Sequence, residues 1–310
     1  MMVNPFRNRD VVSIKDFSKD DLLYLFSMAD KIENLSEKER AHLLEGKILG
    51  YLFFEPSTRT RLSFEAAMLW LGGKCLGFAE PRTSSVEKGE NLADTVRTVE
   101  NYVDVIVIRH YRDGAAKFAA EVSNKPVING GSGTEEHPTQ AMTDLYTIIK
   151  EKGDIDGLKI GILGDLKYGR TVYSLLYALS LFNVKIKLIS HPMLRVRREI
   201  FFDLEKKISL SEHDNVEEVL PELDVLYVTR VQKERFPDLA EYEKVRSSYV
   251  VNLKILQKAK EDLIILHPLP RVDEISYEVD NSRYAKYFKQ TLYGKRLRAA
   301  LLASILDATS

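Results

Sequence analysis

The chain has 310 residues, of which 45% are hydrophobic and 29% charged, a composition typical of globular proteins and a length that suggests about two domains. Its 45 lysines and arginines balance 46 aspartates and glutamates, so no overall charge favours nucleic acid or an anionic membrane as a partner. A single cysteine excludes an internal disulfide framework, and six scattered histidines argue against a Cys/His metal site. The first residues lack a signal-peptide pattern, and no apolar run reaches the ~18 residues of a membrane span, so we expect a cytoplasmic protein.

Short apolar runs alternate with longer amphipathic stretches, a pattern typical of βα units around a mainly parallel sheet. The predicted strands cover residues 47–54, 74–78, 104–109, 126–129, 158–164, 184–190, 224–230 and 263–268. The predicted helices between and after them include residues 61–71, 113–123, 138–152, 171–182, 194–207 and 293–308. We therefore expect an α/β fold of two doubly wound domains, each with a mainly parallel central sheet flanked by helices.

The alternation of strands and helices breaks once, at residues 152–157, and then restarts. We place the junction between the two halves near this break, with the helix before it as a bridge. The last predicted helix can cross back onto the first domain. The expected domains are residues 1–136 with 291–310, and residues 137–290.

Six of the predicted strands end directly in polar segments that contain sharp turns. These segments are residues 55–61, 109–110, 129–133, 164–170, 229–232 and 267–271. Ligands of open α/β sheets bind outside the carboxyl ends of the strands, so we expect the segments to share one crevice between the two domains. Most of them contain an arginine, which indicates small anionic ligands.

The segment Ser57-Thr58-Arg59-Thr60-Arg61 lies between a predicted strand and a predicted helix. A helix start offers unpaired N–H groups and the positive end of the helix dipole, which favour phosphate. The simpler interpretation is a serine N-cap followed by a solvated basic turn. That interpretation explains Ser57 but not two arginines at the end of a helix where the dipole opposes them.

Residues 164–171 nearly match the phosphate-binding P-loop pattern, with Arg170 in the place of the lysine. Arginine does not reproduce the compact charge of lysine, which weakens this interpretation, but a nucleotide-binding protein stays an alternative. The same turn lacks the glycine spacing of a dinucleotide site, and the next predicted strand ends without an acidic residue. We therefore do not expect NAD.

Three further segments carry candidate ligand residues. Arg109 ends an apolar strand, where a ligand explains a charge better than packing does, and His137 precedes a predicted helix. The turn at 267–270 contains two prolines and can aim backbone carbonyls at a ligand. The polar segment 83–90, judged from its residues alone, is best interpreted as an exposed loop.

Taken together, these segments resemble the aspartate/ornithine carbamoyltransferase family, and within it the catalytic chains of the aspartate enzymes. The resemblance is carried, in the family's order, by residues 54–61, 88–90, 109–110, 137–140, 164–170, 229–235 and 267–274. The S-T-R-T-R and H-P-T-Q motifs are shared by carbamoyltransferases generally, whereas T-R-V-Q and H-P-L-P-R-V-D-E-I resemble the aspartate enzymes. The S-M-G loop and H-C-L-P turn of the ornithine enzymes are absent from this sequence.

The resemblance implies transfer of a carbamoyl group from carbamoyl phosphate to L-aspartate, an early step of pyrimidine biosynthesis. It implies that carbamoyl phosphate is bound by Ser57, Thr58, Arg59, Thr60, Arg109, His137, Gln140 and the backbone of Leu269 and Pro270. Among these, the residues that act on the reacting group would be Arg59, Thr60, Arg109 and His137. Aspartate would be bound by Arg170, Arg230 and Gln232.

The resemblance also implies a homotrimer with shared active sites. Ser84 would reach carbamoyl phosphate, and Lys88 would reach aspartate, from a neighbouring subunit. Whether separate regulatory chains bind the trimer, with allosteric control by nucleotides, stays open. A carbamoyltransferase for another amino acid and a non-catalytic oligomeric homologue are the remaining alternatives.

The residue types agree with this chemistry. The nucleophile is the amine of the substrate, so the reaction needs fixed positive charge and preorganised donors, with no covalent intermediate, metal or cofactor. One departure from the family is the pair Glu135-Glu136, which stands where an amide is more usual. We expect it to add negative charge beside the predicted anion site.

Overall fold

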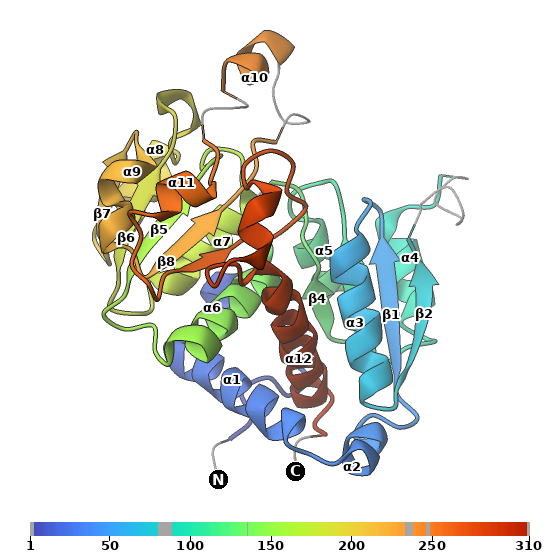
Figure 1. Ribbon diagram of the computed structural model, residues 1–310. Helices are drawn as coiled ribbons and strands as arrows, with labels where there is room; N and C mark the ends of the chain where they lie inside the picture. The colour runs from blue at the N-terminus through green and yellow to red at the C-terminus, as the bar shows by residue number, and fades with distance from the viewer. Residues whose placement is uncertain (1–2, 80–88, 135, 233–237, 246–248, 309–310) are drawn as a thin grey trace. The chain divides into compact units, whose positions relative to one another are not determined.

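The computed structural model describes residues 3–79, 89–134, 136–232, 238–245 and 249–308. The chain divides into two compact units, residues 1–146 with 291–310 and residues 147–290. Each unit contains one sheet in which every strand pair is parallel, with helices packed against it (Figure 1). This confirms the predicted α/β architecture with two doubly wound domains.

The first unit contains a four-stranded sheet in the order β2-β1-β3-β4. Its strands are β1 (Ile48–Phe53), β2 (Lys74–Phe78), β3 (Val105–Arg109) and β4 (Val127–Asn129). Its helices are η1 (Ile14–Asp16), α1 (Lys19–Glu33), α2 (Glu37–His42), α3 (Thr58–Trp70), α4 (Leu92–Val99) and α5 (Ala115–Val122).

The two faces of this sheet are covered by different helices because successive side chains of a strand point to opposite faces. Leu52 and Ile106 belong to a core cluster with Val96 of α4 and Ala119 of α5. On the other face, the ring of Tyr51 lies 5.9 Å from the guanidinium of Arg61 on α3. The central strands are therefore buried on both sides, as their continuous apolar runs predict.

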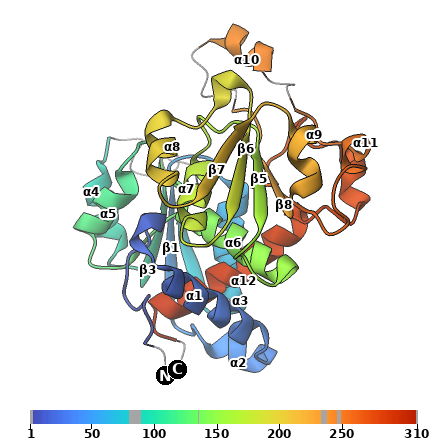
Figure 2. The ribbon, with the colours of Figure 1, turned by 90° about the vertical axis from the view of Figure 1, so that its left-hand side faces the viewer.

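The second unit contains a five-stranded sheet in the order β7-β6-β5-β8-β9, and Figure 2 shows β7, β6, β5 and β8 side by side. Its strands are β5 (Lys159–Leu163), β6 (Lys185–Ile189), β7 (Ser209–His213), β8 (Val225–Val228) and β9 (Ile264–Leu266). Its helices are α7 (Arg170–Leu179), η4 (Pro192–Leu194), α8 (Arg198–Leu204), α9 (Val216–Val219), η5 (Leu220–Glu222), α10 (Leu239–Val245), α11 (Leu253–Leu256) and η7 (Tyr277–Asn281). Two helices, α6 (Pro138–Lys152) and α12 (Tyr287–Ile305), belong partly to each unit.

The eight predicted strands all form, and their ends differ from the predicted ends by at most two residues. The sequence pattern missed β7, whose residues Ser-Leu-Ser-Glu-His are not apolar. This strand lies at the edge of its sheet, where a polar composition is common because one side faces no partner strand. The predicted helix 194–207 is also wrong in part, because only residues 198–204 form an α-helix.

Gly164, directly after β5, brings the ends of β5 and β8 together. Its φ is +124°, and a Cβ at this position would lie 2.0 Å from the carbonyl oxygen of Thr229. The amide of Thr229 in turn donates a hydrogen bond to the carbonyl oxygen of Leu163 at 2.8 Å. Only glycine allows this approach, so the loops that follow the two strands begin side by side.

Replacing Gly164 by alanine should therefore destabilise the fold by roughly 3 kcal/mol, since the side chain adds a backbone clash to an unfavourable φ. Gly153→Ala is the matched control, because its φ is +88° but a Cβ there meets nothing within 4 Å. The control should lose only about 1 kcal/mol. Urea unfolding of both variants measures the difference, and equal losses would contradict the close approach at Gly164.

Candidate active site

In the first unit, the predicted anion-binding residues follow the carboxyl ends of neighbouring strands. Phe53 of β1 is in register with Arg109 of β3, and Ile108 is in register with Asn129 of β4. Arg109 is thus the last residue of the central strand and lies between the loops that follow β1 and β4. This is the edge of a parallel sheet at which ligands bind.

The Ser57–Thr60 segment forms the start of α3. Ser57 is the N-cap residue, but its side chain makes no capping hydrogen bond. Thr58 and Arg59 are exposed, whereas Thr60 is buried. Arg61 forms an ion pair with Glu65 at 3.0 Å, and both residues belong to α3. The simple N-cap interpretation therefore explains neither the Ser57 hydroxyl nor the exposed Arg59.

Thr60, Arg109 and His137 come together beside Gly131. His137, which is 4% exposed, lies with Nε2 3.2 Å from the Thr60 hydroxyl. A Cβ on Gly131 would be 2.9 Å from the His137 ring and 3.2 Å from Nη1 of Arg109. Glycine at this position, with a φ of +103°, lets the imidazole and the guanidinium approach one surface.

Two contacts orient Arg109 within this cluster. Its Nη1 donates to the carbonyl of Gly130 at 3.3 Å, and its Nε lies 3.5 Å from a carboxylate oxygen of Glu55. Glu55 is not among the predicted site residues, although it closely follows the apolar run of β1. The pair leaves a half-buried guanidinium at the end of the strand, where it can stabilise an anion.

Glu136, directly before His137, and Gln140, three residues after it, each make defined hydrogen bonds. The Glu136 carboxylate accepts hydrogen bonds from the Ser13 hydroxyl at 2.6 Å and the Ile14 amide at 2.9 Å, and burial raises its pKa. The expected negative charge of Glu136 is thus directed at η1, while Glu135 lies outside the described residues. Gln140, in the first turn of α6, donates from Nε2 to Asp144 at 2.7 Å.

In the second unit, the buried Asp165 joins the loops after β5 and β8. One carboxylate oxygen accepts from the amides of Lys167 and Tyr168 at 3.2 and 2.9 Å, and the other accepts from the amide of Gln232 at 3.3 Å. The Gln232 side chain also donates to the carbonyl of Tyr168 at 3.4 Å. The loop amides that a P-loop would present to phosphate are therefore bonded to a carboxylate, which counts against that alternative.

The two predicted aspartate-binding arginines lie on these same loops. Arg170 is the first residue of α7 and is 8% exposed, and Arg230 follows β8 and is half-buried. Because β5 and β8 are neighbours, both arginines leave the sheet at the same edge. Two cations on adjacent strand ends suit a ligand with two carboxylates.

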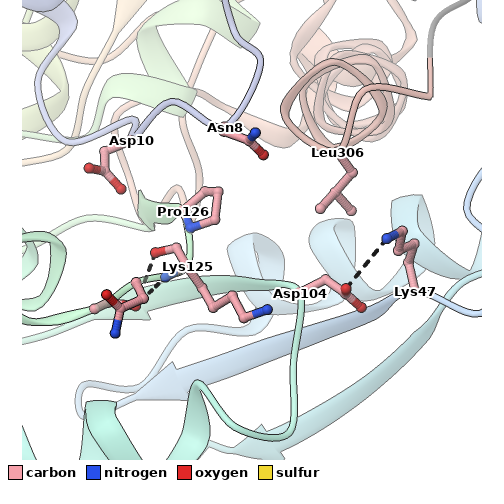
Figure 3. A pocket seen from close by; sticks show the side chains of 9 residues that line it. Asn8, Asp10, Lys47, Asp104, Lys125, Pro126 and Leu306 are labelled. Atoms are coloured by element: carbon pink, nitrogen blue, oxygen red, sulfur yellow. Dashed lines mark hydrogen bonds and ion pairs between the residues drawn. The ribbon is translucent and has the colours of Figure 1, made fainter.

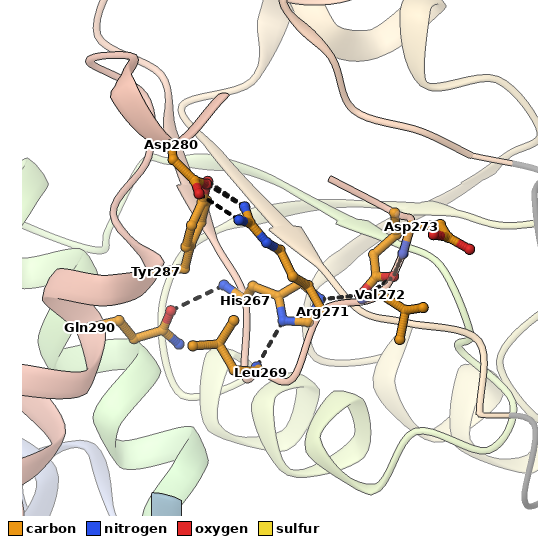
Figure 4. Close-up of polar contacts among 9 residues, drawn as sticks. His267, Leu269, Arg271, Val272, Asp273, Asp280, Tyr287 and Gln290 are labelled. Atoms are coloured by element: carbon orange, nitrogen blue, oxygen red, sulfur yellow. Dashed lines mark hydrogen bonds and ion pairs between the residues drawn. The ribbon is translucent and has the colours of Figure 1, made fainter. Parts of the chain in front are cut away.

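A third loop, after β9, is held by His267 and Glu274 (Figure 4). Nδ1 of His267 accepts from the Leu269 amide at 2.7 Å, so the proton is on Nε2, which donates to Glu274 at 2.7 Å. The second oxygen of Glu274 accepts from the amides of Val272 and Asp273 at 3.1 Å each. Leu269 has a φ of +55° and precedes a cis bond to Pro270, so the network fixes an unusual turn.

A salt bridge holds the far side of this turn. The Arg271 guanidinium pairs with Asp280 and also donates to the Tyr287 hydroxyl at 3.0 Å. The turn that contains Leu269 and Pro270 is thus held by contacts of His267, Glu274 and Arg271.

The predicted site residues that the structure describes therefore fall into two groups, one in each unit. The first unit holds Ser57, Thr58, Arg59, Thr60, Arg109, His137 and Gln140, and the second holds Arg170, Arg230, Gln232, Leu269 and Pro270. Ser84 and Lys88 lie outside the described residues. That the two groups share one crevice remains a prediction.

A polar pocket of about 530 Å³ lies at the opposite edge of the first sheet (Figure 3). Lys47, Asp104 and Pro126, which directly precede β1, β3 and β4, are among its lining residues. None of the predicted site residues lines it. Within the described residues, there is no cluster of three His, Cys, Asp or Glu side chains that could hold a metal ion, and no helix is long and apolar enough to cross a membrane.

Comparison with known proteins covers nearly the whole chain. The family model described as "Aspartate/ornithine carbamoyltransferase, carbamoyl-P binding domain" matches residues 9–150, and that of the "Asp/Orn binding domain" matches residues 156–305. The aspartate carbamoyltransferase catalytic subunit of Nitrosopumilus maritimus is 59% identical over 98% of this chain and 99% of its own length. That of Methanopyrus kandleri is 55% identical, with the same coverage.

Solved structures give the same result. The catalytic subunit of M. jannaschii aspartate transcarbamoylase has a TM-score of 0.89 and 50% identity, over 96% of this chain and 98% of that one. The Trypanosoma cruzi aspartate transcarbamoylase in complex with carbamoyl phosphate and aspartate has a TM-score of 0.93 and 39% identity, over 98% of both chains.

The Glu274 network predicts a pH-dependent stability. Burial alone would raise the pKa of Glu274, but the hydrogen bond from His267 and those from the backbone amides hold it below its ordinary 4.5. Its contribution is thus complete above pH 4.5 and is lost as the pH falls through the lowered pKa. Glu274→Ala leaves three donors without their acceptor and should cost about 3 kcal/mol of unfolding free energy at pH 7.

The difference between wild type and Glu274→Ala should shrink in acid. Denaturant unfolding at pH 7 and at successively lower pH values measures it. Glu261→Ala is the control, because that side chain is 88% exposed and lies 3.6 Å from Arg283. A loss at Glu274 that stays constant into strong acid would contradict the role of its carboxylate.

Proposed function

Because the chain belongs to the aspartate/ornithine carbamoyltransferase family, we propose that it transfers the carbamoyl group of carbamoyl phosphate to the amine of L-aspartate. The products are N-carbamoyl-L-aspartate and phosphate, an early step of pyrimidine biosynthesis. The observation that carries this assignment is the match of both halves to relatives that are aspartate carbamoyltransferases at 54 to 59% identity.

Carbamoyl phosphate would bind in the first unit, with its phosphate at the start of α3. There the helix N-terminus, the hydroxyls of Ser57 and Thr58 and the guanidinium of Arg59 offer donors and positive charge. The Thr60–Arg109–His137 cluster would contact the carbamoyl oxygen. The contact between Thr60 and His137 and the bond from Arg109 to the Gly130 carbonyl support this placement, because they fix the donors before the substrate arrives.

The reaction forms a bond from the aspartate nitrogen to the carbamoyl carbon and breaks the bond from that carbon to the phosphate oxygen, while the amine loses a proton. Negative charge grows on the carbamoyl oxygen during attack. Arg109, Thr60 and His137 would stabilise that charge, so catalysis would come from positioning and fixed electrostatics. No covalent enzyme intermediate is needed, because the amine is itself the nucleophile.

L-Aspartate would bind in the second unit. Arg170 and Arg230 would each pair with one carboxylate, and Gln232 would support the loop that carries Arg230. The bond from the Gln232 amide to Asp165 supports this role. The backbone of Leu269 and Pro270 would accept hydrogen bonds from the carbamoyl and amino groups. The predicted domains, residues 1–136 with 291–310 and residues 137–290, would close over the two substrates and exclude water.

We further propose a cytoplasmic homotrimer in which Ser84 and Lys88 complete the site of a neighbouring subunit. The relatives are named catalytic subunits, which supports association of this chain with separate regulatory chains. Neither a metal nor a cofactor has a role in the proposed reaction.

Substitution of an arginine in each unit should affect the two substrates differently. Arg230→Ala should raise the KM for aspartate roughly a hundredfold, from the loss of charge-assisted hydrogen bonds, with little change in carbamoyl phosphate affinity. Arg59→Ala should weaken the binding of carbamoyl phosphate more than that of aspartate. Initial-rate kinetics with each substrate varied in turn measures both effects.

Arg198→Ala is the matched control for charge removal. Arg198 is half exposed, pairs with Glu212 at 2.8 Å and is not a predicted site residue, so both KM values should stay unchanged. If Arg230→Ala weakened both substrates equally, the aspartate role of Arg230 would be wrong.

A further inference from the structure

Arg298 on α12 is a buried cation in the first unit that the proposed chemistry does not use. It is 4% exposed, and its guanidinium lies 5.1 Å from the centre of the Phe64 ring. Burial lowers its pKa to about 10, an effect that the charge of Asp144 partly offsets. Burying a charge is unfavourable unless a partner compensates it. The presence of Arg298 and Asp144 together in the interior therefore needs an explanation.

Asp144 connects Arg298 to the predicted substrate site. It is fully buried on α6, one turn after Gln140, and accepts the hydrogen bond from Nε2 of Gln140 at 2.7 Å. The resemblance assigns Gln140 to the nitrogen of the carbamoyl group. Arg298, Asp144 and Gln140 thus form a sequence of neighbours that leads from the interior to the site.

A glycine allows α12 to approach α6 at this point. A Cβ at Gly294 would lie 2.9 Å from Nη1 of Arg298 and 3.2 Å from Cγ2 of Thr143, the residue before Asp144. The helices are therefore packed closely where the cation and the carboxylate lie. Such packing leaves the two charged side chains little freedom to move.

The chemistry of a carboxylate fixes the orientation of Gln140. An ionised carboxylate only accepts hydrogen bonds, so Gln140 must turn its amino group toward Asp144. Its carbonyl oxygen then remains to accept from a ligand. The amino group of a carbamoyl moiety is a donor, whereas the methyl group of an acetyl moiety is not.

We propose that Asp144 and Arg298 are positioning residues: Asp144 orients Gln140 to select the carbamoyl amino group, and the charge of Arg298 compensates that of the buried Asp144. The inference rests on the proposed function, because it assigns the ligand of Gln140. Without the cation, the charge of the buried carboxylate is uncompensated, and the arrangement that holds Gln140 is weakened. An asparagine at position 144 can donate as well as accept, so it allows the Gln140 amide to invert.

The test compares three anions that differ at one group. Calorimetry gives the Kd of carbamoyl phosphate, acetyl phosphate and inorganic phosphate for the full-length chain and its variants. Arg298→Met and Asp144→Asn should each weaken carbamoyl phosphate about tenfold and change acetyl phosphate and phosphate less than about twofold. Arg298→Lys keeps the charge and should retain most of the preference for carbamoyl phosphate.

Arg296→Met is the matched control on the same helix, since Arg296 pairs with Glu33 at 2.7 Å. It should leave all three Kd values unchanged. An equal loss of all three ligands in Arg298→Met and Asp144→Asn would assign both residues a purely structural role and overturn the proposal. Unchanged carbamoyl phosphate binding in both variants would overturn it as well.

Turnover is measured separately, so that the two proposals can fail independently. A wild-type chain that binds carbamoyl phosphate in preference to acetyl phosphate but does not carbamoylate aspartate would contradict the proposed function only. If Arg298→Met fails to fold, Asp144→Asn still decides the outcome, because it preserves the volume of the buried side chain.

Discussion

Parallel strand pairing is the constraint on which the candidate site depends. In both sheets every neighbouring pair is parallel, so the carboxyl ends of adjacent strands lie at one edge. The loops after β1, β3 and β4 therefore gather in the first unit, and the loops after β5, β8 and β9 gather in the second. Arginines on these loops concentrate positive charge that an isolated helix or hairpin could not assemble.

Carboxylates shielded from solvent fix the positions of groups in and around these loops. Asp165, Glu274 and Asp144 each accept at least one hydrogen bond from a loop amide or from a predicted ligand residue. Each carboxylate thereby fixes the direction of a neighbouring group before any substrate is bound. Groups preorganised in this way suit a reaction without a covalent intermediate, because they need not rearrange as charge develops.

The fold was largely predictable because its strands are buried on both faces and therefore form continuous apolar runs. The edge strand β7 was not, since its composition is polar. Helix α1 was not predicted either, although its capping box at Ser18 and Asp21 is a signal that the sequence contains. The strand ends were accurate to within two residues because polar segments follow the apolar runs directly.

The site was predictable in its arginines but not in its supporting acids. Arg109 and Arg230 follow apolar strands, where a charge is conspicuous, whereas Asp165 and Glu274 resemble ordinary turn residues. Their importance depends on contacts with residues far along the chain, such as the bond from the Gln232 amide to Asp165. For the segment 83–90, the residue types alone predict only an exposed loop. The roles of Ser84 and Lys88 are predicted from the family resemblance.

The central claim is that the two arginine-bearing groups serve one carbamoyl transfer to a dicarboxylic amino acid. The most direct measurement is formation of the N-carbamoyl product by the purified chain with carbamoyl phosphate, with L-aspartate compared with L-ornithine and with a chelator present. The account predicts product with aspartate alone, at a rate that the chelator does not change. Equal use of ornithine, or no product from a folded oligomer with either amino acid, would contradict it.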